Sequence, residues 1–121
     1  HWLDSGTWTL GCGAGFAMGV KALKPKSTVI VLFGDGALGW SLSEFDTFAR
    51  HKLNIITIVG NNASWEQIYR AQMPEFHNDI ATRLNYTRYD KIVEPFGCKG
   101  LCVKSVNELR PALDLAMVYS K

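Results

Sequence analysis

Two short apolar runs, each ending at a glycine, place the strongest constraint on how this chain folds. The first covers residues 29–33 and ends in Gly34-Asp35-Gly36, and the second covers residues 55–59 and ends in Gly60-Asn61-Asn62. Short runs rich in β-branched residues are typical of buried parallel strands. The segment between them is long enough for the helix of a right-handed crossover. We therefore predict a βαβ unit in which the two strands lie side by side.

Polar side chains follow both predicted strands at the same edge of the sheet. Because the carboxyl ends of neighbouring parallel strands meet there, Asp35 and Asn62 should lie close together in space. Carboxylate and carboxamide oxygens are hard ligands that suit Mg²⁺ or Ca²⁺. The glycines beside Asp35 allow backbone N–H groups to approach an anion closely. The sequence therefore predicts a metal–phosphate site at this edge.

The rest of the chain predicts an open α/β layer: a truncated three-layer fold with a parallel sheet and helices on both faces. Helical patterns cover residues 10–23 and about 42–51, with Ser41 and Glu44 forming a capping box before the second. Residues 72–86 are predicted to form a loop, 89–96 a short helix, 100–103 a third strand, and 106 onward a helix that Ser105 and Glu108 cap.

Composition narrows the class of protein. With 121 residues the chain is one domain at most, and we expect it to be a soluble piece of a longer protein, because it begins with neither an initiator Met nor a signal peptide. A net charge of +2 without a Lys/Arg run argues against nucleic-acid binding, and no apolar stretch reaches the length of a membrane span. The three cysteines cannot all pair and form no CxxC, so we expect reduced thiols.

The two strand ends also resemble a known signature. Gly34-Asp35-Gly36 followed by Asn61-Asn62, with Asn62 27 positions after Asp35, is similar to the motif of thiamine-diphosphate-dependent enzymes. Residues 4–117 resemble the diphosphate-binding domain of the group that holds acetolactate synthase, oxalyl-CoA decarboxylase and 2-hydroxyacyl-CoA lyase. Residues 44–52, together with Trp65, most resemble the acetolactate-synthase-like 2-hydroxyacyl-CoA lyases. The resemblance implies thiamine diphosphate and Mg²⁺ as cofactors, and cleavage of 2-hydroxyacyl-CoA at C1–C2 into formyl-CoA and a shortened aldehyde.

The resemblance also assigns roles to residues. The Asp35 and Asn62 side chains and the Ser64 carbonyl would bind Mg²⁺. Leu10 would hold the two cofactor rings in a bent shape, and its N–H and the Trp8 carbonyl would bind the aminopyrimidine. The residues that the family pattern places against the cofactor are Trp8, Thr9, Leu10, Gly34, Asp35, Gly36, Ala37, Asn62, Ser64 and Trp65.

The catalytic base is expected elsewhere. In this family a Glu facing the pyrimidine comes from another domain, usually across a homodimer or homotetramer interface, and no Glu in this chain matches its motif. We therefore predict that the fragment alone is inactive. The resemblance further implies a full-length protein anchored in the endoplasmic reticulum membrane with a cytosol-facing catalytic region. Some relatives also have a flavin-type (FAD) middle domain, and the sequence leaves open whether the full-length protein has one.

Several alternatives stay open at this point. Leu10 can be an ordinary core leucine, and Trp65 either packs as a half-buried aromatic or forms a substrate wall with Ile68. An acetolactate synthase or a 2-oxo-acid decarboxylase is the first rival function, although the residues after Asn62 differ from those usual in acetolactate synthases. The second rival is a degenerate, non-catalytic assembly module. The intact Asp35 and Asn62 argue against it, because packing alone does not require these groups.

Overall fold

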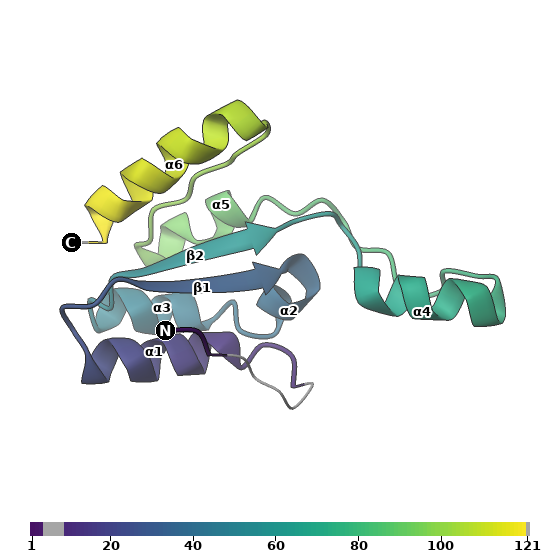
Figure 1. The fold of residues 1–121 in the computed structure, drawn as a ribbon, viewed down its shortest axis with the longest axis horizontal. Coiled ribbons are helices and arrows are strands. Elements are labelled where there is room, and N and C mark those ends of the chain that lie inside the picture. Colours follow the sequence, from purple (N-terminus) through teal and green to yellow (C-terminus); the bar gives the residue numbers. More distant parts are fainter. Residues whose placement is uncertain (4–8, 121) are drawn as a thin grey trace.

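The structure is a computed structural model that describes residues 1–3 and 9–120. Its elements follow the chain in this order: α1 (Gly13–Leu23), β1 (Val29–Gly34), α2 (Asp35–Gly39), α3 (Glu44–Arg50), β2 (Ile55–Gly60), α4 (Glu66–Phe76), α5 (Tyr89–Ile92), the 3-10 turn η1 (Glu94–Phe96) and α6 (Val106–Tyr119). Figure 1 shows the two strands at the centre of the body and α4 projecting away from it.

Strands β1 and β2 form a parallel pair, as the sequence predicts. Their register runs from Val29 opposite Ile55 to Gly34 opposite Gly60, so both strands end at the same level. The connection contains α3, which makes the unit a βαβ crossover. The residues that follow the two glycines consequently begin at one edge of the sheet.

One face of β1 faces the hydrophobic core. Val29, Val31 and Phe33 are buried, whereas the alternate residues are exposed, because successive side chains of a strand point to opposite faces. Helices α1 and α3 lie on the buried side (Figure 1). The buried core consists of Ala14, Ala17, Val29, Val31, Phe33, Leu38, Phe45, Phe48 and Val93.

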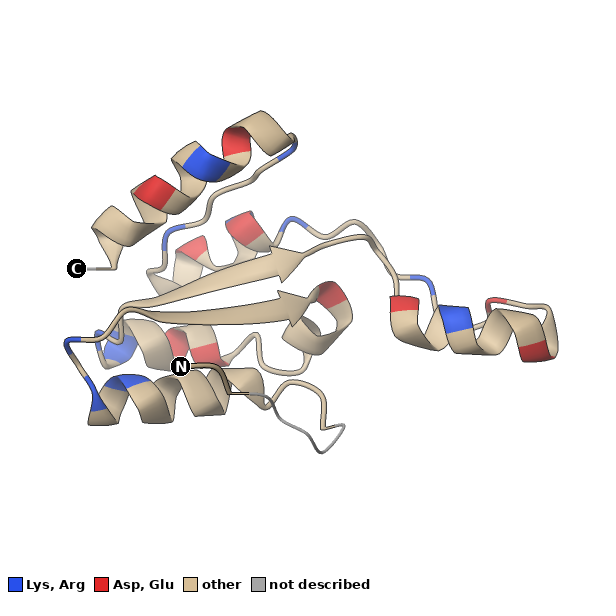
Figure 2. Ribbon diagram, viewed as in Figure 1, with Lys and Arg blue, Asp and Glu red and all other residues tan. Residues whose placement is uncertain are grey.

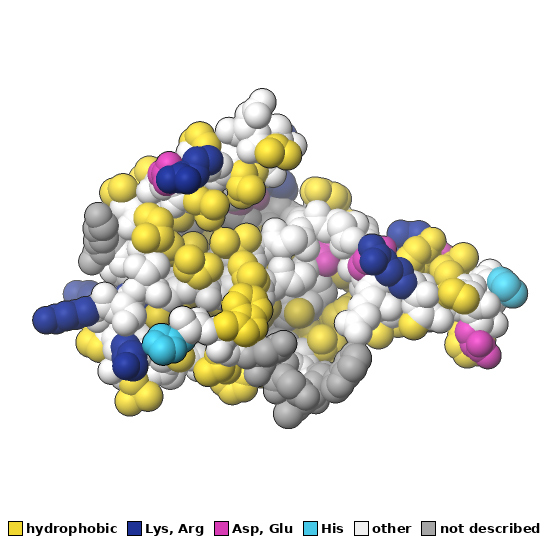
Figure 3. Space-filling view, viewed as in Figure 1, with side chains coloured by type: hydrophobic (Ala, Val, Ile, Leu, Met, Phe, Trp, Pro, Cys, Tyr) yellow, Lys and Arg dark blue, Asp and Glu magenta, His cyan; other side chains and the backbone are white. Residues whose placement is uncertain are grey.

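The opposite face of the sheet is less covered. Ile30 and Leu32 are 50% and 55% exposed. Helix α6 lies on that side of the strands, so helices are found on both sides, but no residue of α6 is buried. Hydrophobic side chains are accordingly visible across the middle of the body in Figure 3. Among the described residues, no helix is long and apolar enough to cross a membrane.

Four local predictions are wrong. Ser105 is the N-cap of α6, but its side chain makes no cap hydrogen bond, and Glu108 Oε2 accepts a bond from the Lys104 N–H, so the predicted capping box does not form. Residues 100–103 form no strand, because Leu101 and Val103 remain about two-fifths exposed and little burial stabilises them against the sheet. The predicted loop begins later, since α4 continues through Pro74 to Phe76. Ser41 does not cap α3: the N-cap is Ser43, and backbone carbonyls of the preceding turn already accept the first N–H groups of the helix.

Candidate functional site

Asp35 is the first residue after β1 and the most buried charged group at the sheet edge. It is 3% exposed. Its Oδ1 accepts a hydrogen bond from the Gly36 N–H at 3.0 Å, and its Oδ2 accepts one from the Ser64 N–H at 3.2 Å. None of the described Lys, Arg or His residues forms an ion pair with it. A buried carboxylate without a counter-charge is costly, so this position is suited to a cation.

The segment after β2 reaches Asp35 through its backbone. Ser64 is buried, and its N–H bond to Asp35 joins residues that are 29 positions apart in the sequence. Its Oγ donates to the Thr82 carbonyl at 3.3 Å, and the N–H of Trp65 donates to the same carbonyl at 2.8 Å. The structure therefore brings Asp35 and the Ser64 backbone together; the contact is made by the Ser64 N–H, whereas the predicted metal ligand is the Ser64 carbonyl.

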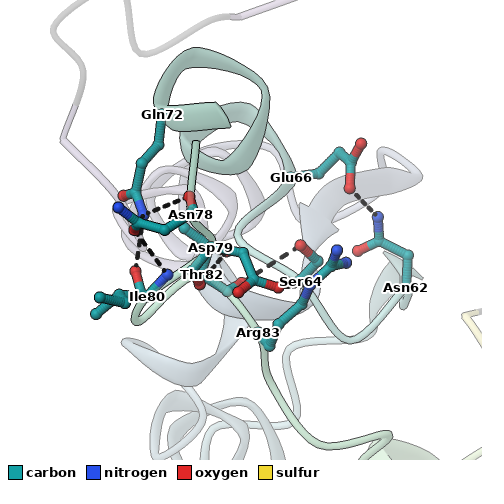
Figure 4. A network of polar contacts seen from close by, with 9 residues as sticks. All are labelled: Asn62, Ser64, Glu66, Gln72, Asn78, Asp79, Ile80, Thr82 and Arg83. Carbon is teal, nitrogen blue, oxygen red and sulfur yellow. Dashed lines mark hydrogen bonds and ion pairs between the residues drawn. The ribbon is translucent and has the colours of Figure 1, made fainter. Parts of the chain in front are cut away.

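Asn62, the third predicted ligand, is turned elsewhere. Its side chain is exposed, and its Nδ2 donates to Glu66 Oε2 at 3.3 Å; Figure 4 shows the two side chains pointing toward each other. Glu66 also pairs with Arg70 at 2.8 Å. The neighbouring Asn61 donates to the Thr87 carbonyl at 2.8 Å, and its Oδ1 is buried without a partner in the described part of the chain. The strand ends thus meet as predicted, but no described hydrogen bond joins Asp35 to Asn62.

A cavity of about 410 Å³ opens beside Asp35. Its lining comes from α2 and the residue after it, from the segment after β2, from the segment before α5 and from the first residue of α5: Asp35, Gly36, Gly39, Trp40, Trp65, Leu84 and Tyr89. The indole ring of Trp65 lies directly against Gly36: a Cβ built on Gly36 would be 2.6 Å from the ring. A side chain larger than hydrogen therefore has no room between them. Trp65 is half-buried and lines this cavity, whereas Ile68, its predicted partner in a substrate wall, is exposed and is not among the described lining residues.

Tyr89 was not predicted from the sequence as part of the site. Its hydroxyl donates to the backbone carbonyl of Asp35 at 3.2 Å, across 54 positions of sequence. The start of α5 is fixed beside it by the Arg88–Asp90 ion pair, whose Nη2 to Oδ2 distance is 2.6 Å. Arg88 lowers the pKa of the Asp90 carboxyl through this hydrogen bond and its charge. Nothing local in the sequence identifies Tyr89, because its partner belongs to a distant strand end.

Thr82 was also missed. It is almost fully buried, and its carbonyl accepts a bond from the Ser64 hydroxyl (Figure 4). The same carbonyl accepts a bond from the Trp65 N–H. The chain returns through an isolated antiparallel bridge between Ser64 and Arg83. Arg83 pairs with Asp79 at 3.0 Å and lies over the Tyr69 ring at 4.2 Å. These contacts hold α4 and the segment after it, residues 77–83, together as one unit, and this unit joins the sheet next to Asp35 through Ser64.

The predicted cofactor residues near the N-terminus are only partly described. Trp8 lies outside the described residues. Thr9 and Leu10 are exposed and lead into a turn before α1. A Cβ built on Gly11, which has a positive φ of 82°, would come 2.7 Å from the Cβ of Trp40, a residue that lines the cavity. This segment therefore passes beside the cavity, on the side of Trp40. Gly34 is exposed, Gly36 is buried and Ala37 is half-buried.

A family model and individual relatives match this chain. Residues 1–121 match the model described as thiamine pyrophosphate enzyme, C-terminal TPP binding domain. The chain is 51% identical over 109 residues to 2-hydroxyacyl-CoA lyase 2 of Mus musculus, covering 89% of the chain and 17% of that protein. It is 48% identical over 124 residues to 2-hydroxyacyl-CoA lyase 2 of Caenorhabditis elegans, covering all of the chain and 19% of that protein.

A more distant relative and a solved structure also match. The acetolactate synthase large subunit of Mycobacterium tuberculosis is 38% identical over 117 residues, which cover 95% of the chain and 21% of that protein. The thiamine diphosphate-dependent 4-hydroxybenzoylformate decarboxylase of Rhodococcus jostii RHA1 superposes with a TM-score of 0.85 at 20% identity, covering 92% of this chain and 21% of that one. The superposition confirms the predicted fold class. The chain thus spans about a fifth of the length of these proteins.

Proposed function

The chain belongs to the thiamine pyrophosphate enzymes, as their C-terminal cofactor-binding domain, and from this premise we propose that it holds the cofactor's diphosphate through Mg²⁺. The metal ligands in this proposal are the Asp35 and Asn62 side chains and the Ser64 carbonyl. Diphosphate oxygens and water would complete the six oxygen ligands that Mg²⁺ requires.

The Asp35 carboxylate is buried, and none of the described basic residues pairs with it; this observation carries the proposal. Its two backbone hydrogen bonds fix its position, and the cavity beside it gives a ligand access to that edge of the sheet. The buried Asn61 Oδ1, which has no hydrogen-bond partner among the described residues, is a further acceptor in the same segment. Asn62 is bonded only to an exposed Glu66 oxygen, so its side chain can turn toward a cation at low cost. These residues fit a divalent cation and an anion bound together.

The remaining cofactor contacts in the proposal involve backbone and apolar groups. N–H groups from Gly34 to Ala37 would contact the diphosphate, since the glycines leave room for close approach. Leu10 would support the cofactor rings, with Trp8 and Thr9 beside it. The position of Gly11 next to Trp40 supports this part of the proposal, because it brings the segment alongside the cavity.

We infer that the full-length protein is a 2-hydroxyacyl-CoA lyase that cleaves a C–C bond. Thiamine diphosphate supplies a stabilised carbanion when bound, and the residues of this chain anchor and orient it. The activating Glu would come from a pyrimidine-binding domain of the same protein, across a homodimer or homotetramer interface. The identity of about 50% to proteins named 2-hydroxyacyl-CoA lyase 2 supports this choice of substrate class. An endoplasmic reticulum anchor in the full-length protein remains part of the proposal.

The second candidate function is an acetolactate synthase or 2-oxo-acid decarboxylase activity, which the 38% identity to an acetolactate synthase supports. Parallel assays of the full-length protein with pyruvate and with a 2-hydroxyacyl-CoA separate the two functions. Formyl-CoA production without acetolactate supports the lyase, and the reverse result replaces it. Neither product would favour a non-catalytic assembly module.

Asp35→Ala in the full-length protein tests the metal site. We expect Mg²⁺-dependent binding of thiamine diphosphate, measured by isothermal titration calorimetry, to weaken by more than about 100-fold, because even residues that only support a metal ligand contribute 10–100-fold. Asp46→Ala is the matched control, since Asp46 is an exposed partner of Arg50 away from the cavity. Unchanged affinity in Asp35→Ala would show that the metal lies elsewhere.

A further inference from the structure

A second cavity, of about 600 Å³, lies at the other end of the two strands. It is lined by the segments that precede β1 and β2, by the end of α1 and by the end of α6: Lys21, Ala22, Pro25, Lys26, Ser27, Thr28, His51, Lys52, Leu53, Asn54 and Ser120. Asp35 follows β1, so the two cavities lie at opposite ends of the sheet and share no lining residue. Figure 2 shows Lys and Arg segments gathered at the end where the strands begin.

Lys21 is the buried charged group of this cavity. It is 7% exposed, and its Nζ donates to the Ser27 carbonyl at 2.8 Å. An ammonium group has three donors, and the structure gives this one a single acceptor among the described residues. No described carboxylate forms an ion pair with it. One hydrogen bond offsets little of the desolvation cost of a buried ammonium group. An anion in the cavity would supply the negative charge and the further acceptors that the described residues do not provide.

Three further basic groups line the same cavity. Lys26, His51 and Lys52 are exposed, whereas Lys21 is buried, so positive charge extends from the interior of the cavity to its mouth. No Asp or Glu is found among the described lining residues. A purely structural role, in which Lys21 ties the end of α1 to the turn before β1, explains its bond to Ser27. It does not explain why several basic groups line the cavity with no Asp or Glu among the described lining residues.

We propose that this cavity binds a phosphate-bearing anion, with the Lys21 ammonium contacting the phosphate. A phosphate group carries up to two charges and three acceptor oxygens, which match several separate donors. Lysines act as point charges toward phosphate, and the Ser27 and Thr28 hydroxyls are additional donors on the lining. The volume falls within the range of small-molecule sites, so it accommodates a phosphate group alone or a mononucleotide.

The test measures binding of two probes, inorganic phosphate and AMP, to the full-length protein by isothermal titration calorimetry. EDTA is present and thiamine diphosphate is absent, so that Asp35 cannot hold either probe through a metal. We expect saturable binding of both probes at one site. Equal affinities show that the phosphate group alone is recognised, and tighter AMP binding shows that the cavity also contacts the nucleoside; either result supports the site.

Lysine variants locate the binding. Lys21→Met keeps the aliphatic packing and removes the charge, and we expect it to weaken phosphate binding by about 10-fold or more, as loss of a charged hydrogen bond predicts. Lys26→Gln removes an exposed lining charge and should weaken binding by roughly 3-fold. Lys24→Gln is the matched control, because Lys24 follows α1, is exposed and is not among the residues that line the cavity. The affinity of this variant for phosphate should differ from that of the wild-type protein by less than about 2-fold.

Three outcomes overturn the proposal. The first is the absence of saturable binding to wild-type protein. The second is unchanged affinity in Lys21→Met when far-UV circular dichroism shows that this variant is folded. The third is an equal loss in Lys26→Gln and Lys24→Gln, which would indicate only a diffuse positive field. If that variant does not fold, the comparison of Lys26→Gln with Lys24→Gln decides.

Discussion

Replacing Gly36 by Ala should destabilise the chain through one contact, that with Trp65. Gly36 is buried in α2 at a negative φ, so its backbone accepts an alanine. The new Cβ, however, would lie 2.6 Å from Cε3 of the Trp65 ring and 2.7 Å from Cδ2, and this distance must open to about 3.4 Å for ordinary contact. The indole or the backbone of α2 must therefore move.

Two opposing terms set the magnitude. Alanine is favoured over glycine within a helix by about 1 kcal/mol. Forcing an extra methyl group into a packed contact costs roughly 1–3 kcal/mol. The free energy of unfolding should therefore fall by up to about 2 kcal/mol in Gly36→Ala. Gly39→Ala is the matched control in the same helix. Apart from its chain neighbours and the backbone of its own helix, no atom of the described residues lies within 4 Å of its built Cβ, so only the favourable helix term applies.

Urea denaturation followed by far-UV circular dichroism measures both variants. A double-mutant cycle with Trp65→Ala isolates the contact: the cost of Gly36→Ala should disappear when the indole is absent, which corresponds to a coupling of about 1–3 kcal/mol. Equal stability of Gly36→Ala and Gly39→Ala, or no coupling to Trp65, would refute the contact of the ring with Gly36.

Three further predictions follow from single contacts. Phe48→Ala removes a buried core side chain and should lower the free energy of unfolding by about 3–5 kcal/mol in urea denaturation, whereas a loss below about 1 kcal/mol would contradict its place in the core. Tyr89→Phe removes the hydrogen bond to the Asp35 carbonyl and should cost about 0.5–1.5 kcal/mol in the same assay; an unchanged midpoint would show that the bond contributes nothing. Burial raises the pKa of the Cys98 thiol, so at about pH 8 a smaller fraction of Cys98 is thiolate than in an ordinary exposed cysteine. Iodoacetamide should therefore modify the exposed Cys102 before Cys98. Mass spectrometry should also show Cys98 modification accelerating as the pH rises above 9, and equal rates for the two thiols would argue against this effect.

The local sequence was sufficient to predict the central part of the fold, the parallel pair of strands β1 and β2. The β-branched runs before Gly34 and Gly60 have few alternatives to buried strands, and the distance between them allows a crossover helix. Their parallel pairing then places the next residues at one sheet edge without any knowledge of distant contacts. The burial of Asp35 follows from this arrangement, because Asp35 comes directly after the buried strand β1, at the edge where β2 also ends.

Features that depend on distant contacts were missed. The roles of Thr82 and Tyr89 rest on partners 18 and 54 positions away, so nothing in their neighbourhood indicates them. Capping of α3 was predicted wrongly for a related reason. The Ser41–Glu44 pattern is compatible with a capping box, but the preceding turn supplies backbone acceptors that make the side chain unnecessary.

Asn62 shows where prediction from sequence stops even when the position is right. The end of β2 determines where its Cα lies, but the direction of its side chain depends on which partner competes best. In the structure that partner is Glu66, through an exposed bond of 3.3 Å that contributes little, and Glu66 already pairs with Arg70. Binding of a cation beside Asp35 would change this balance, because a carboxamide oxygen gains more from a divalent ion than its amide gains from an exposed carboxylate. The signature therefore predicts which residues can become ligands, whereas their final orientation depends on the ion.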